Sequence, residues 1–254
     1  MQQTPSARLV QFNGNGQRRD PRWLESVISY LPVFRRTSQR HVAGIATYCR
    51  AQAVRRGALL CGRGDALPGV MALAYGFVKL ALPRTEGDER VVRFVGASET
   101  FGEAAALLDR PSPVDAVALA DSMVVVIPPR PLLELLELDP NFARSMVCSL
   151  AEGSLELLTE LEASVRQRSV QRLADYLGSL VRRRTDPGVC AVRLPATKTA
   201  IAARLGVTKE TLSRLLRELA TRGLIEVARN EIMIFDRARL AELAGGGNGS
   251  GGAA

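Results

Sequence analysis

The segment from residue 197 to residue 219 constrains the fold more than any other part of the chain. Its sequence, TKTAIAARLGVTKETLSRLLREL, reads as two short helices joined by a turn at Gly206. Four leucines of the second helix fall at i, i+3, i+4 and i+7, namely Leu212, Leu215, Leu216 and Leu219. This spacing is that of a single apolar stripe. The pair must therefore rest its leucine stripe on a small core and leave another face in solvent.

Another face of the second helix carries Glu210, Ser213, Arg214 and Arg217 at the same spacing. These side chains offer a carboxylate, a hydroxyl and guanidinium groups, and the base edges in the major groove of DNA present partners for all of them. Thr208 stands where a helix N-cap belongs. The arrangement predicts a DNA-binding helix-turn-helix whose second helix is the recognition helix. The alternative is an ordinary helical hairpin with a solvated charged face.

Positive charge is concentrated around this segment. The chain has a formal net charge of +8. Residues 166–240 contain 16 basic and 7 acidic side chains, whereas residues 1–165 contain 18 of each. A basic region beside a neutral one is typical of a domain that binds phosphates, and charge needed only for solubility would not be sorted by region. The distribution therefore favours double-stranded DNA as the partner.

The remaining chemistry-bearing residues exclude most other classes of function. The cysteines, Cys49, Cys61, Cys148 and Cys190, are scattered without a C-x-x-C pair and read as cytosolic thiols. His41 is the single histidine, so we expect neither a zinc site nor a catalytic triad that depends on histidine. Because the sequence has no P-loop and no nucleophile–base pair, an enzyme is not expected. No apolar run approaches the roughly 20 residues that span a bilayer, so the expected location is the cytoplasm.

The fold class expected is α+β, with five regions along the chain. Residues 1–20 read as a disordered lead, 21–140 as a β-roll domain, 141–168 as a dimerisation helix and hinge, 169–240 as a winged helix-turn-helix domain, and 245–254 as a flexible tail.

The first domain changes character near residue 53. Residues 21–52 read as helical, and residues 53–130 alternate short apolar runs with glycines. Strands are expected at residues 58–61, 70–75, 77–82, 91–95 and 123–127. Short strands at regular spacing with glycine turns predict an antiparallel barrel or roll.

A short helix is expected at residues 131–138 and a longer one at 141–165. In the longer helix Met146, Leu150, Leu157 and Leu161 form a seam of near-heptad spacing, through which two copies of the chain could pair. The alternative is a helix that lies on its own roll, and we expect both contacts, one on each face. The polar residues 166–171 are the expected hinge to the next domain.

The region after the helix pair predicts a wing. Residues 224–227 and 231–235 read as two strands around a short turn that carries Arg229 at its tip. A connector at residues 182–195 precedes the helix pair.

Residues 205–216, LGVTKETLSRLL, and residues 223–225, GLI, resemble the CRP/FNR family of bacterial transcription regulators, and the resemblance extends over residues 30–240. It implies that residues 21–140 form an effector-sensing β-roll domain of the cyclic-nucleotide-binding type. The E-T-x-S-R form is similar to the FNR-type recognition helix. The resemblance implies that Glu210 accepts a hydrogen bond from cytosine, Arg214 binds guanine, and Ser213 contacts a thymine or its neighbour. Lys209 takes a position that reads bases in CRP-like members. The implied operator is a palindrome of TTGA-like half-sites read by a homodimer.

The resemblance also implies which groups bind the DNA backbone. Thr197, Lys198 and Thr208 match residues that contact phosphates in the family. Arg217 on the recognition helix and Arg229 at the wing tip are expected to bind phosphates as well.

The expected effector pocket contains Gly102, Glu103 and Arg110, because residues 101–103, FGE, match the start of the family's phosphate-binding cassette. Members that bind cyclic AMP have an Arg-Ser pair about ten residues further on, where this chain has Pro113 and Val114. A cyclic phosphate needs a cation or several N–H donors. Cyclic AMP is therefore not the expected effector, and a cyclic-nucleotide-responsive regulator is kept as an alternative.

Residues 101–113 resemble the Dnr-type branch of the family, which responds to nitric oxide through haem. A haem-based nitric oxide sensor is thus a further alternative, with His41, Cys49, Cys61 or Met71 as candidate axial ligands and none of them singled out. The iron–sulfur cluster of FNR-type members is not expected, because the sequence lacks clustered N-terminal cysteines. The effector, a small molecule or a gas, stays unidentified.

The resemblance implies a contact with RNA polymerase. Glu86, Asp88 and Glu89 lie in an acidic turn that matches an activating loop, and residues 182–189 match a second contact surface. The alternative for the acidic turn is a solvated loop. The expected function is a homodimeric transcription regulator, an activator, under allosteric control from the roll. A sensory module whose main partner is a protein is the remaining alternative.

Overall fold

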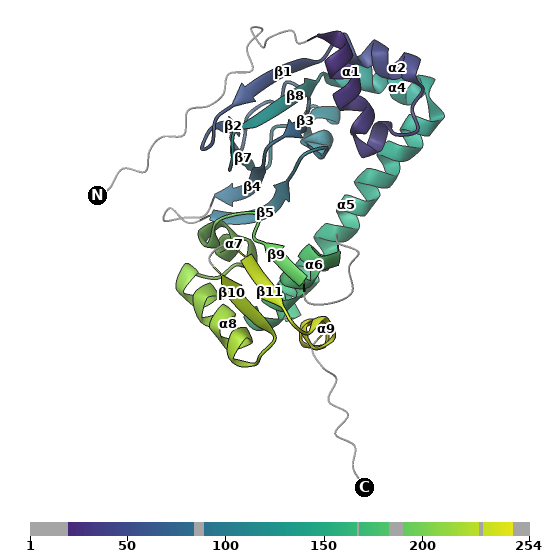
Figure 1. Ribbon diagram of the computed structural model, residues 1–254. Coiled ribbons are helices and arrows are strands. Elements are labelled where there is room, and N and C mark those ends of the chain that lie inside the picture. The colour runs from purple at the N-terminus through teal and green to yellow at the C-terminus, as the bar shows by residue number, and fades with distance from the viewer. Residues whose placement is uncertain (1–19, 84–88, 167, 183–189, 229–230, 246–254) are drawn as a thin grey trace, which may run out of the picture. The chain divides into compact units, whose positions relative to one another are not determined.

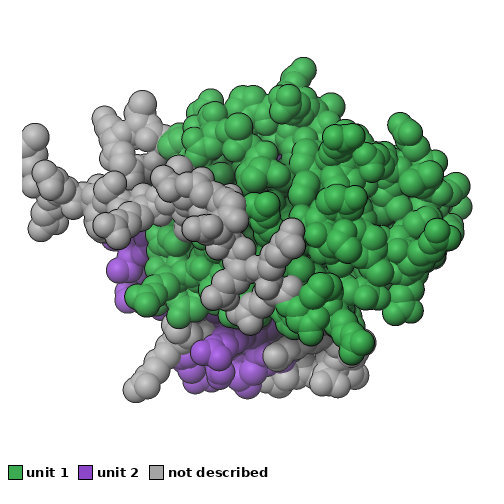
Figure 2. Space-filling view, turned by 90° about the horizontal axis from the view of Figure 1, so that it is seen from above, with its two compact units in different colours: residues 1–154 green, residues 155–254 purple. Residues whose placement is uncertain are grey.

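The computed structural model describes residues 20–83, 89–166, 168–182, 190–228 and 231–245, apart from the side chains of residues 163–166 and 182 (Figure 1). The chain divides into two compact units, residues 1–154 and residues 155–254, which Figure 2 shows in different colours. The expected lead before residue 20, the wing tip and most of the expected tail lie outside the described residues. None of the helices in the described ranges is long and apolar enough to cross a membrane.

The first unit begins with three helical segments, α1 (Pro21–Tyr30), the 3-10 helix η1 (Pro32–Phe34) and α2 (Gln39–Ala46). Strand β1 (Arg50–Val54) follows, so the expectation of helix up to residue 52 is wrong. All five residues of β1 pair antiparallel with β8 (Ser122–Ile127), and Ala51 and Val54 are buried. These sheet contacts outweigh the weak strand preference of the alanines in β1.

The expected β-roll is confirmed as two antiparallel four-stranded sheets with strand orders β1-β8-β3-β6 and β2-β7-β4-β5. Strand β7 (Asp115–Ala118) was not expected, since its buried residues are the two alanines Ala116 and Ala118. It forms because it lies between β2 and β4 and completes the hydrogen bonds of both. The remaining strands are β2 (Leu59–Cys61), β3 (Val70–Tyr75), β4 (Val78–Pro83), β5 (Glu89–Val95) and β6 (Thr100–Phe101).

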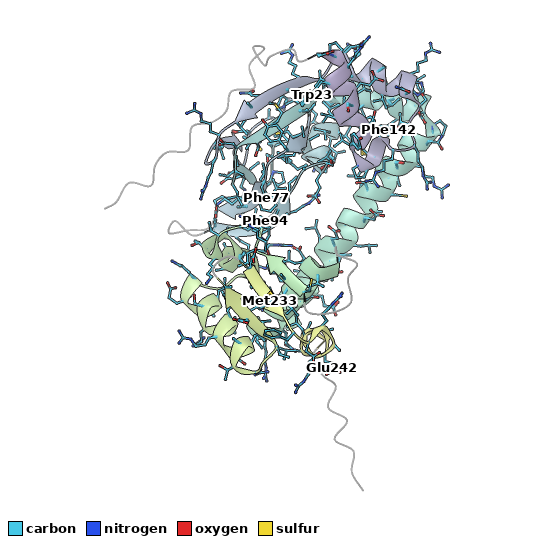
Figure 3. All side chains as sticks on the ribbon, viewed as in Figure 1. Trp23, Phe77, Phe94, Phe142, Met233 and Glu242 are labelled. Atoms are coloured by element: carbon cyan, nitrogen blue, oxygen red, sulfur yellow. The ribbon has the colours of Figure 1, made fainter. Side chains whose placement is uncertain are left out.

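The turn between β3 and β4 requires a glycine. Gly76 has φ of 106°, and a Cβ atom there would lie 2.0 Å from Ser122 Oγ. The same hydroxyl accepts a hydrogen bond from the Phe77 backbone at 3.2 Å, so the turn is held against the start of β8. Phe77 then stacks on Phe94 of β5, with ring centroids 5.4 Å apart (Figure 3).

Two apolar clusters form the core of the first unit. One fills the inside of the roll around Met71, Leu73 and Phe101. The other lies between the helices and the sheet β1-β8-β3-β6, and includes residues of α1, α2, α4 (Pro129–Leu138) and the beginning of α5 (Pro140–Arg166).

The beginning of helix α5 packs on the first unit. Phe142 contacts Phe34 with ring centroids 4.8 Å apart, at the N-terminal end of α5 (Figure 3). Met146 is 3% exposed in the same cluster, so its placement in a seam open to a second copy is wrong. The contact of α5 with its own unit is confirmed, and the exposed apolar positions of the helix begin at Val147.

The second unit is built on a three-stranded sheet of order β10-β11-β9. The two expected wing strands pair antiparallel, and β9, which lies within the expected connector, adds a third strand to β11. Helix α9 has no counterpart among the expected elements. The elements are α6 (Ser169–Arg182), β9 (Cys190–Arg193), α7 (Lys198–Leu205), α8 (Lys209–Thr221), β10 (Ile225–Ala228), β11 (Glu231–Ile234) and α9 (Arg237–Ala244).

Candidate DNA-binding interface

Helices α7 and α8 form the expected helix-turn-helix. The Thr197 side chain caps α7 by accepting from the Ala200 backbone at 3.3 Å, and the Thr208 side chain caps α8 by accepting from the Thr211 backbone at 3.2 Å. Gly206 ends α7 in the left-handed conformation, with φ of 66° and ψ of 36°, which a residue without a Cβ atom adopts at no steric cost. Two caps and one glycine therefore define the geometry of the turn.

The leucine stripe of α8 is buried as its spacing predicts. Leu212, Leu215, Leu216 and Leu219 are all under 9% exposed, and Leu219 is fully buried. They belong to one apolar cluster with residues of α6, α7 and the sheet. This packing fixes the rotation of α8 about its own axis, and so decides which side chains face solvent.

The opposite side of α8 presents the expected base-reading residues to solvent. Lys209, Glu210, Ser213, Arg214 and Arg217 are all exposed. Within the described part of the chain, no ion pair engages the charged groups of these residues. The Ser213 hydroxyl donates to the Lys209 carbonyl at 3.0 Å, and it must turn away from this carbonyl to donate to a base. The face combines donors and acceptors, as the major groove requires.

The expected phosphate-binding residues lie at the beginnings of the two helices. Thr197 and Thr208 are exposed caps, and Lys198 is half-buried in the first turn of α7. Backbone N–H groups at a helix N-terminus attract anions, so two such termini beside threonine hydroxyls suit phosphate oxygens. Arg229 lies outside the described residues.

The residues of the expected effector pocket lie in and around one short helix. Gly102 is the N-cap of α3 (Glu103–Leu107), whose first residue is Glu103. Arg110 is exposed beyond the end of this helix. Val114 packs against the apolar cluster inside the roll, at the position where cyclic AMP-binding members hold the phosphate. The side chain at position 114 is therefore apolar and supplies no cation.

The four candidate haem ligands do not form a single group. His41 Nδ1 lies 2.8 Å from Asp139 Oδ2. Cys49 is buried in the cluster between helices and sheet, where burial raises the pKa of its thiol to about 12. Cys61, whose thiol pKa is also raised by burial, and Met71 belong to the cluster inside the roll. Of these four side chains, Cys61 and Met71 share one apolar cluster, and a haem-based sensor stays a prediction.

The expected polymerase contact is only partly visible. Glu86 and Asp88 lie outside the described residues, as do positions 183–189 of the second expected surface. Glu89 begins β5, and its carboxylate pairs with the Lys79 ammonium of β4. The ion pair holds the Glu89 side chain against the sheet.

Sequence periodicity missed one group of residues beside the interface. Glu160 of α5 pairs with Arg204 of α7, and Arg172 of α6 donates to the carbonyl of Leu205 at 3.2 Å. The first pair is separated by 44 residues in sequence, so no local pattern signals it.

Comparison with known proteins agrees with this architecture. The family model of the cyclic nucleotide-binding domain matches residues 51–139 of the sequence. The family model of the Crp-like helix-turn-helix domain matches residues 171–243. The Fumarate and nitrate reduction regulatory protein of Escherichia coli (strain K12) is 30% identical over 201 residues, which cover 77% of this chain and 79% of that protein.

Solved structures show the same fold. A transcriptional regulator of the CRP/FNR family from Thermus thermophilus is 25% identical with a TM-score of 0.62, over 77% of this chain and 98% of that one. FixK2 from Bradyrhizobium japonicum has a TM-score of 0.67 at 22% identity, over 77% of this chain and 96% of that one, and supports the fold.

The relatives are transcription regulators rather than enzymes. Regulators of this kind bind DNA, are typically dimeric and contact RNA polymerase. The finer placement in the Dnr-type branch stays a prediction. The roll of two four-stranded sheets and the helix-turn-helix with its exposed polar face agree with the two matched domain models. Together with the relative of 30% identity, they show that the chain belongs to the CRP/FNR family of DNA-binding transcription regulators.

Proposed function

We propose that this regulator acts as a homodimer that reads two inverted TTGA-like half-sites, one through each α8. The observation that carries the proposal is the division of α8 into a fully packed leucine face and an exposed face of Lys209, Glu210, Ser213 and Arg214. The packed leucine face holds the helix in place, and the side chains of the other face stay exposed where they can contact base edges.

Each reading residue has chemistry for one kind of base edge. Arg214 carries a planar guanidinium that donates two hydrogen bonds to guanine, and Glu210 accepts from the amino group of cytosine. Glu210 also lies in the first turn of α8, where the helix dipole stabilises a carboxylate. Lys209 and Ser213 lie on the same exposed face and would contact neighbouring bases.

The exposed apolar face of α5 supports the homodimer. Its large exposed side chains are Val147, Leu150, Leu155, Leu157, Leu158 and Leu161. Positions 147, 150, 154, 157 and 161 follow the alternating spacing of three and four residues that pairs two helices in a coiled coil. Exposed apolar side chains in a row along one helix mark a contact surface. A second copy of the same helix satisfies this pattern along its length.

The effector of the roll is best matched by an uncharged small molecule or a gas. Val114 packs against the apolar cluster inside the roll, and an apolar side chain there suits an uncharged ligand better than a phosphate. Binding in or near the roll would change the pairing of the two α5 helices and thereby the separation of the recognition helices. The turn with Glu86, Asp88 and Glu89 is proposed as a contact with RNA polymerase.

The proposal is tested by DNA binding of Arg214→Ala, with Arg239→Ala as the matched control. Both changes remove one exposed guanidinium from a helix of the second unit, but Arg239 lies on α9, away from the reading face of α8. We expect Arg214→Ala to weaken binding to a synthetic duplex with two inverted TTGA-like half-sites by about tenfold or more, because a base contact is worth about 1–3 kcal/mol. Arg239→Ala should leave the affinity nearly unchanged.

A salt titration separates DNA recognition from a module that binds only protein. The affinity of the wild-type protein should fall steeply with salt, because each neutralised phosphate adds about 0.9 to the logarithmic slope. An affinity without salt dependence, or an Arg214→Ala variant that still prefers the half-sites over a scrambled duplex, would contradict the proposal.

A further inference from the structure

The end of helix α7 is anchored to α5 by a two-pronged ion pair. Arg204 Nη1 donates to Glu160 Oε2 at 2.7 Å, and Arg204 Nη2 donates to Glu160 Oε1. The two side chains are 21% and 39% exposed, respectively. A guanidinium and a carboxylate that meet through two parallel hydrogen bonds fix their relative orientation as well as their distance. Both residues belong to the compact unit of residues 155–254.

A second arginine holds the same end of α7 from α6. Arg172 Nε donates to the backbone carbonyl of Leu205 at 3.2 Å, and Arg172 Nη2 donates to Ser169 Oγ at 3.3 Å. Leu205 is the last residue of α7 and precedes Gly206 of the turn. The last turn of α7 is thus tied to α5 through a side chain and to α6 through a carbonyl.

This anchor lies directly before the recognition helix. Helix α8 begins at Lys209, five residues after Arg204, and between them lie only the end of α7 and the short turn. Glu160 in turn lies on α5 next to Leu161 and one turn from Leu157, two residues of the proposed dimer face. The expected hinge at residues 166–171 falls inside the 44-residue segment that the ion pair closes.

We propose that Glu160 and Arg204 are positioning residues that set the direction of α8 relative to α5, and thereby the separation of the two recognition helices in the dimer. The inference rests on the proposed function, because the separation matters only when two copies read two half-sites. With the pair intact, the end of α5 and the helix-turn-helix move as one body. With the pair broken, the hinge lets α8 take several directions.

The inference predicts the dependence of binding on half-site spacing. The probes are synthetic duplexes with two inverted TTGA-like half-sites whose separation is varied one base pair at a time. Wild-type protein should prefer one separation. Glu160→Gln should weaken this preference by up to about twenty-five-fold, since an ion pair of this exposure is worth up to a factor of about five and a dimer contains two.

Glu160→Gln also separates positioning from simple electrostatics. It removes a negative charge, and a more positive protein binds DNA more tightly in general. A positioning role therefore predicts weaker binding at the preferred separation together with a flatter spacing profile. The charge swap Glu160→Arg with Arg204→Glu should restore much of the preference.

The matched control is Glu134→Gln on α4, which breaks the exposed i,i+4 ion pair with Arg130 and should leave the spacing profile unchanged. Circular dichroism of each variant checks that the helices are intact. If wild-type protein binds the duplexes but Glu160→Gln keeps the wild-type spacing profile, the inference is wrong and the proposed function stands. If wild-type protein binds none of the duplexes, the proposed function fails and the inference falls with it.

Discussion

Asp139 joins three helices of the first unit, and its replacement should destabilise that unit. Its carboxylate is 5% exposed, between the end of α4 and the start of α5. Oδ1 accepts from the backbone N–H groups of Asn141 at 3.0 Å and Phe142 at 3.2 Å. Oδ2 lies 2.8 Å from His41 Nδ1 and accepts from the Ser38 backbone at 3.5 Å. The side chain therefore caps α5 and holds the beginning of α2.

The size of the effect follows from these contacts. Loss of a helix N-cap costs about 1 kcal/mol. Loss of the hydrogen bond to His41 costs about 1–2 kcal/mol more, toward the lower end because the imidazole is one third exposed. Asp139→Ala should therefore lower the free energy of unfolding by about 2–3 kcal/mol, which for a unit of this size is roughly 6–9 °C in the melting temperature. Asp139→Asn keeps a capping oxygen and should lose about half as much.

The loss should depend on pH with a definite sign. The hydrogen bond to His41, with help from the N–H groups of Phe142, Ser38 and Asn141, lowers the pKa of Asp139 below its ordinary value. Because the folded pKa lies below the unfolded one, the contribution is fully present above about pH 4 and is lost as the pH falls through the folded pKa. The gap in stability between wild-type protein and Asp139→Asn should narrow below about pH 4.

Urea unfolding followed by tryptophan fluorescence measures this loss. Trp23 is the sole tryptophan, and it packs against the helical cluster of the first unit, so its signal reports that unit. A loss under about 0.5 kcal/mol for Asp139→Ala would refute the reasoning, since that is the scale of an ordinary surface change. A gap between wild-type protein and Asp139→Asn that stays constant from pH 3 to pH 7 would refute the ionic part of it.

Two further predictions concern packing and thiols. Leu219→Ala should lower the free energy of unfolding of the second unit by about 2–5 kcal/mol, because the Leu219 side chain is fully buried. Leu108 is exposed, so Leu108→Ala should cost far less. Thermal unfolding followed by circular dichroism compares the two variants. Cys148 is exposed and should react quickly with a thiol reagent in the native protein, whereas Cys49, with its pKa raised to about 12 by burial, should react only after unfolding. A fast phase that persists in Cys148→Ser would contradict the second prediction.

The sequence predicted best where one local pattern carries the information. The leucine spacing and the threonine caps located α7 and α8, and they assigned the reading face of α8 to solvent. The alternation of apolar runs and glycines predicted the roll. Strands β1 and β7 were not predicted because alanine occupies one buried position of β1 and both buried positions of β7. Alanine has a weak strand preference, so the pairing with neighbouring strands decides the structure of both.

The sequence by itself determined the class of this protein. Helix caps and leucine spacing are patterns of a few neighbouring residues, and the concentration of positive charge is a property of regional composition, so all of them can be read without the fold. The tertiary structure decided which residues act together across the chain. It moved Met146 from a dimer seam into the core and paired Glu160 with Arg204. Periodicity shows which face of an element is apolar, but only packing determines which other element covers that face, and contacts between distant residues follow from that packing.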